Sequence, residues 1–76
     1  MNINLTLIIS ANCQTCYRAL NTLAKIRLAY PNLLTEIIDI NYYHDKRILI
    51  TPALLINNHL FCYGDIDETK LLAEII

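Results

Sequence analysis

The sequence is poor in the residues that bend or interrupt a chain. It contains one glycine, two prolines and no tryptophan in 76 residues. Scarce glycine and proline exclude a collagen-like or low-complexity chain, and no segment has the composition of a flexible linker. We therefore expect residues 1–76 to form a single domain, near the lower size limit for independent folding.

Charged residues are also scarce. They make up 17 % of the chain, and the formal net charge is −1, whereas a typical domain has about 25 % charged residues. Because the basic residues form no patch, we expect no nucleic-acid partner. The apolar run Leu5–Ile9 has no basic leader and is too short for a signal peptide or a membrane span, so we expect no membrane association.

Apolar residues are abundant, at 55 % of the chain. A small domain cannot bury all of them, and exposed apolar surface usually marks an interface. We therefore expect a homodimer or a protein partner. The chain has three cysteines and no recognisable export signal, which indicates a cytoplasmic, reducing location. There, a close cysteine pair is more often catalytic, redox-sensing or metal-binding than a structural staple.

Apolar runs and hydrophobic periodicity predict six regular elements. They are strands at Leu5–Ser10, Leu33–Ile40, Ala53–Ile56 and His59–Tyr63, and helices at Gln14–Tyr30 and Glu68–Ile76. The segment Asn41–Leu49 has room for one or two helical turns only.

Local signals set the ends of these elements. Pro31 ends the first helix, because the residue before a proline avoids the α region. Asn57-Asn58 predicts a two-residue hairpin turn, since asparagine tolerates positive φ. Asp65 and Glu68 fit a capping box before the last helix. The first helix is expected to carry one apolar stripe, which consists of Leu20, Leu23, Ile26, Leu28 and Tyr30.

The predicted order is β-α-β-short α-β-β-α. A helix joins the first two strands, so they should be parallel with a right-handed crossover. The last two strands should form an antiparallel hairpin. We expect an α/β fold with a mixed four-stranded sheet and the two main helices on one face.

Two cysteines stand where the first helix begins. Cys13 closes the loop after the first strand, and Cys16 follows one helical turn later. Free N–H groups and the helix dipole stabilise an anion at this position, and only the thiolate form of cysteine is nucleophilic. The spacing lets Cys16 attack a mixed disulfide formed at Cys13. We therefore expect Cys13 to be the nucleophile and Cys16 the resolving thiol.

The chain resembles the thioredoxin/glutaredoxin superfamily, and most closely the small single-domain thioredoxin-like redox-active disulfide proteins. The resemblance is carried by the strand–CxxC–helix unit at Leu5–Tyr30, by Thr51-Pro52 before a strand, by the Asn57-Asn58 hairpin, and by Gly64-Asp65 before the terminal helix. It covers nearly the whole chain, and it implies a minimal thioredoxin fold with thiol–disulfide oxidoreductase activity.

The resemblance also implies a substrate site. It makes the Thr51–Pro52 bond cis, with Pro52 near Cys13, and it gives Thr51 the role of presenting its backbone to an extended substrate segment. Asn12, Gln14 and Thr15, which surround the cysteines, complete the expected substrate-binding residues. The expected partners are a protein disulfide and a thiol reductant or reductase, with no cofactor beyond the disulfide and no metal.

The chain departs from thioredoxins proper at several positions. Those proteins carry Trp before the first cysteine and Gly-Pro between the two, where this chain has Asn12 and Gln14-Thr15. They also bury an aspartate where this chain has Leu7. We therefore expect a specialised disulfide reductase that acts on a specific protein or small-molecule disulfide.

Two other functions stay open at the sequence level. Soft-metal chaperone domains also place CxxC at the start of a helix, and two thiolates suit Cu(I) or Zn(II), although those domains resemble β-α-β-β-α-β. A non-enzymatic thioredoxin-like interaction module is the third hypothesis.

The remaining residues of interest have ordinary structural interpretations. Cys62 is expected to be buried or half-buried. His44 and His59 are interpreted as lone surface histidines, and Tyr42-Tyr43 as cover for the open face of the sheet.

Overall fold

A mixed four-stranded sheet runs through the middle of the molecule. In the computed structural model, which describes residues 3–76, its strands lie in the order β2-β1-β3-β4. β2 pairs with β1 in parallel, and β3 pairs antiparallel with both β1 and β4. This confirms the predicted sheet. The strands are β1 (Asn4–Ile9), β2 (Leu34–Asp39), β3 (Ala53–Ile56) and β4 (His59–Tyr63).

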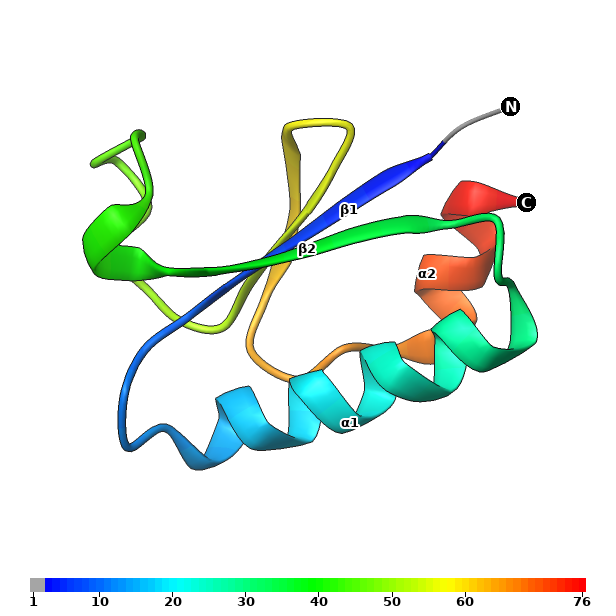
Figure 1. Ribbon diagram of the computed structural model, residues 1–76, viewed down its shortest axis with the longest axis horizontal. Helices are drawn as coiled ribbons and strands as arrows, with labels where there is room; N and C mark the ends of the chain where they lie inside the picture. Colours follow the sequence, from blue (N-terminus) through cyan, green and yellow to red (C-terminus); the bar gives the residue numbers. More distant parts are fainter. Residues whose placement is uncertain (1–2) are drawn as a thin grey trace.

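Both long helices cover the same face of this sheet, as predicted (Figure 1). α1 (Gln14–Ala29) joins β1 to β2, and α2 (Glu68–Ile75) follows β4. The weakly predicted segment after β2 contains a single 3₁₀ turn, η1 (Ile40–Tyr42). None of the described helices is long and apolar enough to cross a membrane.

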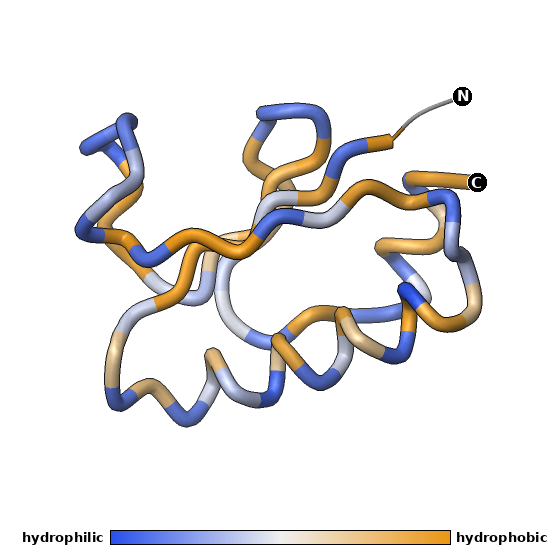
Figure 2. The backbone as a smooth tube through the Cα atoms, in the orientation of Figure 1, coloured by the Kyte–Doolittle hydropathy of each residue, from blue (hydrophilic) through white to orange (hydrophobic). Residues whose placement is uncertain are grey.

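The sheet separates two buried clusters because successive side chains of a strand point to opposite faces. On the helix side, Leu5 and Leu7 of β1 pack with Leu23 of α1 and Leu71 of α2. On the other side, Ile8 belongs to a smaller cluster that the segment after η1 covers. In Figure 2 the strands are mainly hydrophobic, while the hairpin turn and the outer part of the loop after η1 are hydrophilic. The central strand β1 is therefore buried on both faces, as its apolar run predicts.

Two predicted burial patterns are partly wrong. The buried face of α1 consists of Cys16, Ala19, Leu23 and Ile26, whereas Leu28 is 86 % exposed and Tyr30 lies at the exposed C-terminal cap. Ile26 is the last position on the sheet side, and Leu28, two residues further on, is turned about 200° away from it.

The second partly wrong prediction concerns Tyr42 and Tyr43, of which only one is buried. Tyr43 is buried in the second cluster and covers the sheet, as expected, but Tyr42 is 86 % exposed. η1 ends between the two residues. Only one of the two side chains can therefore face the sheet at this point of the chain.

The predicted cap of α2 is also wrong. Asp67, not Asp65, has the extended backbone of an N-cap, and its carboxylate accepts a 3.2 Å hydrogen bond from the Lys70 backbone N–H. Asp65 lies two residues earlier and pairs with Arg18 of α1 instead. A carboxylate satisfies the free N–H groups of a first turn only from the residue that directly precedes the helix.

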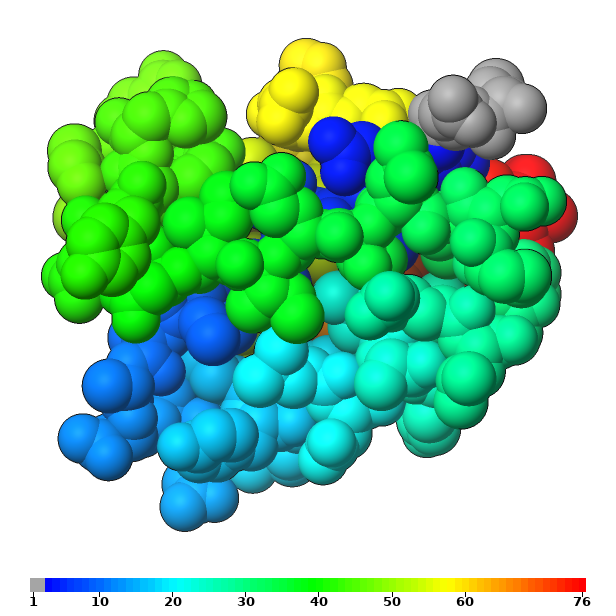
Figure 3. Space-filling model, in the orientation of Figure 1, coloured from blue at the N-terminus to red at the C-terminus, as the bar shows by residue number. Residues whose placement is uncertain are grey.

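β2 forms one edge of the sheet, because it pairs only with β1. In the view of Figure 3, β2 and the segment after it form a continuous green band across the molecule, above α1. Leu34 and Ile37 of this strand are each about half exposed. Some of the abundant apolar side chains are therefore exposed on an edge strand of the sheet.

Candidate disulfide-exchange site

Cys13 forms the N-cap of α1. Its backbone is extended (φ −114°, ψ 106°), and its Sγ accepts a 3.0 Å hydrogen bond from the backbone N–H of Cys16. Its carbonyl accepts the first helical hydrogen bond, from Tyr17 N–H at 3.2 Å. The sulfur thus occupies the place usually taken by a Ser, Thr or Asp oxygen, where an anion is stabilised. The first turn of α1 contains no acidic side chain to oppose such an anion.

Cys13 and Cys16 are joined by a disulfide, with their Cα atoms 5.1 Å apart. The two sulfurs differ in access to solvent. Cys16 is 1 % exposed and faces the sheet from the first turn of α1, while Cys13 is half-buried. A reagent or substrate from solution therefore reaches the Cys13 sulfur more readily than the Cys16 sulfur.

The residues around the cysteines lie at the surface. Asn12 and Gln14 are exposed, and Thr15 is half-buried. Asn12 has a φ of 56°, a left-handed conformation that asparagine adopts more readily than most residues. This conformation turns the chain from the end of β1 into α1. The structure thus gathers Asn12, Gln14 and Thr15 on one exposed turn with Cys13.

Arg18 connects this turn to the segment after β4. Its Nε donates a hydrogen bond to Asp65 Oδ1 at 2.9 Å, and its Nη2 donates to Asp65 Oδ2 at 3.3 Å and to Thr15 Oγ1 at 3.1 Å. The guanidinium beside Asp65 holds the pKa of that carboxyl below its usual value, first by hydrogen bonding and then by charge attraction. The pair is well exposed, so it contributes little to stability. Arg18 thus links Asp65 to Thr15, which lies between the two cysteines in the sequence.

Thr51 and Pro52, which directly precede β3, lie beside the end of β1. The Thr51–Pro52 peptide bond is cis. Thr51 Oγ1 lies 2.6 Å from Ser10 Oγ in a side-chain hydrogen bond, and the Pro52 carbonyl accepts a 2.8 Å hydrogen bond from Gly64 N–H. Ser10 precedes Cys13 by three residues. Thr51 is therefore tied to the chain that leads directly into the cysteine turn.

Sequence reasoning missed Ser10, and it did not single out Arg18. Both make contacts across more than 40 residues of chain, and no local pattern encodes such contacts. Ser10 lies opposite Thr51 because of the register that pairs Ile8 with Ala53, and this register is set by the fold. Arg18 likewise had no signal in the sequence.

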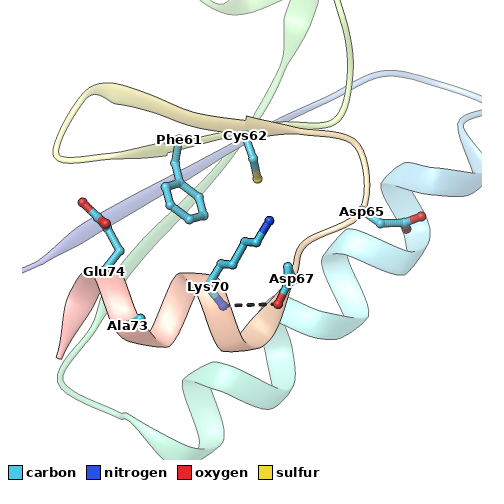
Figure 4. A pocket seen from close by; sticks show the side chains of 7 residues that line it. All are labelled: Phe61, Cys62, Asp65, Asp67, Lys70, Ala73 and Glu74. Carbon is cyan, nitrogen blue, oxygen red and sulfur yellow. Dashed lines mark hydrogen bonds between the residues drawn. The ribbon is translucent and has the colours of Figure 1, made fainter.

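Cys62, the third cysteine, lies on β4 and is not part of the disulfide. It is half-buried on β4, where burial raises the pKa of its thiol, and it lines an open groove of about 530 Å³ between β4 and α2. Figure 4 shows the Lys70 side chain extending toward Cys62, while Asp65 points away from the groove toward α1. The predicted half-buried position of Cys62 is confirmed.

Metal-ligating side chains do not gather in the described part of the chain. Within residues 3–76, no group of three or more His, Cys, Asp or Glu side chains is placed to hold a metal ion. His44 and His59 are both exposed, as predicted.

Comparisons with known proteins agree with this geometry. A family model described as a thioredoxin domain matches residues 1–76, while a search of curated proteins finds no match. Among solved structures, thioredoxin f2 of Chlamydomonas reinhardtii superposes with a TM-score of 0.73 at 16 % identity, over 96 % of this chain and 75 % of that one.

Two further structures superpose in the same way. Oxidised thioredoxin O2 of Arabidopsis thaliana gives a TM-score of 0.70 at 16 % identity, covering 96 % of this chain and 71 % of that one. The germline-specific thioredoxin Deadhead of Drosophila melanogaster gives 0.68 at 16 % identity, covering 97 % and 78 %. At these identities the superpositions show a shared fold.

Proposed function

The chain belongs to the thioredoxin domain family, and from this premise we propose that it is a thiol–disulfide oxidoreductase in which Cys13 attacks and Cys16 resolves. Family membership and the disulfide between Cys13 and Cys16 support thiol–disulfide redox function in general. The proposal adds the direction of the reaction and the role of each residue. It is a specialised reductase of one protein or small-molecule disulfide.

The proposed reaction proceeds in two exchanges. The Cys13 thiolate attacks one sulfur of the substrate disulfide, forms a mixed disulfide and releases the other substrate sulfur as a thiolate, which takes up a proton. Cys16 then loses its proton and attacks the Cys13 sulfur. This closes the Cys13–Cys16 bond and frees the second substrate thiol. Two electrons pass from the dithiol to the substrate, and a thiol reductant or reductase returns them.

One observation carries the assignment of roles. The Cys13 sulfur accepts the Cys16 backbone N–H at the start of α1, and a hydrogen bond to an ionised acceptor is about twice as strong as one to a neutral acceptor. This contact therefore favours a thiolate at Cys13. Cys16 is 1 % exposed, which suits a thiol that reacts only within the protein.

We propose that the substrate binds to the surface around Cys13. Asn12, Gln14 and Thr15 lie on the same turn as Cys13, and Thr51 and Pro52 are tied to the preceding chain through Ser10. An extended segment carrying a disulfide would lie along Thr51 and Pro52 with its sulfur at Cys13. We place the reaction in the cytoplasm, where thiol reductants can regenerate the dithiol.

We also propose that the protein associates with a second copy of itself or with a protein partner. Leu28 and Leu49 are each at least 80 % exposed, and the edge strand β2 displays Leu34 and Ile37. Apolar surface of this kind supports association with a second copy or a protein partner. Sedimentation velocity at increasing concentration distinguishes a dimer from a monomer.

The soft-metal alternative receives less support. The observed order, β-α-β-3₁₀-β-β-α, differs from the β-α-β-β-α-β order of such chaperones. No observation on the described residues favours that alternative over exchange between thiols.

Substrate trapping tests the proposal. In a Cys62→Ala background, which leaves only the site cysteines, Cys16→Ser should accumulate a mixed disulfide at Cys13 with a protein disulfide such as insulin. The matched Cys13→Ser variant should form little or none, because Cys16 is buried. Non-reducing electrophoresis and peptide mass spectrometry identify the bond. Trapping at Cys16 in preference to Cys13 would reverse the two roles. Absence of a mixed disulfide at Cys13 with both insulin and a small disulfide such as oxidised glutathione would refute the proposed reaction.

A further inference from the structure

Ser10 has no role in the reaction as described above, yet it lies where the two sides of the site meet. It directly follows β1, and its Oγ is 2.6 Å from Thr51 Oγ1, with either hydroxyl able to donate. Both side chains are half-buried. The contact joins residues 41 positions apart, so the fold rather than the local sequence creates it.

The position of this contact follows from the register of β1 and β3. The last antiparallel pair is Ile8 with Ala53, and the same register continued by two residues places Ser10 opposite Thr51. The intervening pair contains Pro52, which has no N–H to donate to a ladder. The side-chain hydrogen bond therefore holds the two segments together at the point where backbone pairing stops.

The segment at Thr51 and Pro52 is held on its other side as well. The Pro52 carbonyl accepts the Gly64 N–H at 2.8 Å, which fixes the segment to the end of β4. The hydrogen bond to Ser10 fixes it on the side of Cys13. The three residues from Ser10 to Cys13 can span at most about 10 Å even when fully extended. A change in the Ser10–Thr51 contact thus acts close to the reacting sulfur.

We propose that Ser10 is a positioning residue that holds Thr51, and with it the substrate-receiving edge of the site, in register with the Cys13 turn. This inference rests on the proposed function, in which Thr51 and Pro52 receive an extended substrate segment. It also specifies the substrate class for which Ser10 matters. A protein segment that lies along Thr51 depends on this register, whereas a small disulfide that meets only the Cys13 sulfur does not.

The physical reason is the sensitivity of exchange to alignment. The attacking and attacked atoms must approach to about 3–3.5 Å in line, and a misplacement of 1 Å can reduce the rate about 100-fold. Main-chain contacts along an extended segment supply this alignment for a protein substrate. Without the Ser10 hydroxyl, Thr51 loses one partner, and the edge of the site is less well fixed relative to Cys13.

The experiment compares two disulfides in single-turnover oxidation of the pre-reduced full-length chain in the Cys62→Ala background, where only the two site cysteines can react. The first is insulin, and the second is the small aromatic disulfide 5,5′-dithiobis(2-nitrobenzoate). Ser10→Ala should lower the second-order rate with insulin about 3- to 10-fold, the range expected for one hydrogen bond, and should change the rate with the small disulfide less than about 2-fold. Circular dichroism confirms that each variant is folded under the assay conditions, because thiols of an unfolded chain would also react with the small disulfide.

Further variants separate positioning from general destabilisation. Ser10→Thr keeps a hydroxyl and should restore the insulin rate. Thr51→Val should show the same selective loss as Ser10→Ala, and the double variant should lose no more than either single one, because both remove the same contact. Thr6→Val removes a hydroxyl from within β1 and should leave the ratio unchanged.

Two results would overturn the inference. One is an equal loss of rate with both disulfides in Ser10→Ala, and the other is additive losses in the double variant. Failure of the proposed function has a different signature, because oxidation by either disulfide would then not close the Cys13–Cys16 bond. If the wild type reacts and the ratio does not change in Ser10→Ala, only the role of Ser10 is refuted.

Discussion

At the scale of single residues, Asp45 offers the clearest dependence on pH. Its carboxylate accepts hydrogen bonds from the Arg47 backbone N–H, from Nε and from Nη2, at 2.8 to 3.0 Å. These bonds lower the pKa of Asp45 to about 2 from its usual 3.8. Because the pKa is depressed in the folded state, the stabilising contribution is present above about pH 4 and is lost as the pH falls toward 2.

We therefore expect Asp45→Asn to be less stable than the wild type at pH 6 and to converge with it near pH 2. The difference at pH 6 should be small, because the pair lies at the surface. Urea unfolding midpoints at pH 2, 3, 4 and 6 measure it, with Asp39→Asn as a carboxylate control outside this pair. A difference that stays constant over this range would show that the Asp45 charge contributes nothing.

The residue scale also shows where sequence reasoning stops. Cys13 and Cys16 could be assigned to the start of a helix because a strand and then a helical period surround them. The exposure of Leu28 could not be predicted, since a periodic pattern does not specify where a helix leaves the sheet that it covers. The exposure of Tyr42 could not be predicted either, because the sequence does not show where the 3₁₀ turn η1 ends. The contacts of Ser10 and Arg18 depend on how β3 and the segment after β4 are placed, which is a property of the whole fold.

At the scale of elements, the boundaries follow from local chemistry within about one residue. Pro31 follows the C-cap of α1, and Asn57 and Asn58 adopt φ of 50° and 69° in the hairpin turn, as predicted. The start of α2 at Glu68 was predicted as well, but its cap was not, because two aspartates precede the helix and either can cap it. Only the backbone conformation distinguishes Asp67, the cap, from Asp65, the partner of Arg18.

This distinction predicts different effects for two similar substitutions. Asp67→Ala should lower the free energy of unfolding by about 1 kcal/mol, because the Lys70 N–H loses its acceptor. Asp65→Ala should lower it less, since the pair with Arg18 is exposed. Urea denaturation followed by circular dichroism at 222 nm measures both. If Asp65→Ala were the more harmful substitution, the assignment of the cap would be wrong.

At the scale of the whole molecule, redox cycling requires that the fold survive reduction of its disulfide. Neither buried cluster contains Cys13 or Cys16, and the bond closes a short loop between residues three positions apart. Loop-closure entropy for about four residues corresponds to about 2 kcal/mol. The hydrogen bond from Cys16 N–H to the Cys13 sulfur strengthens when that sulfur becomes a thiolate, which offsets part of this loss.

The reduced protein should therefore remain folded, with a free energy of unfolding lower by up to about 2 kcal/mol. Urea denaturation with and without tris(2-carboxyethyl)phosphine measures the difference, and a variant with both Cys13→Ser and Cys16→Ser should not respond to the reductant. The sign of this stability difference matters for the proposed function. If the oxidised protein is the more stable form, folding favours the disulfide and makes the dithiol a better reductant. Complete unfolding on reduction would make the bond a structural staple, while a reduced form more stable than the oxidised one would make the protein an oxidant rather than a reductase.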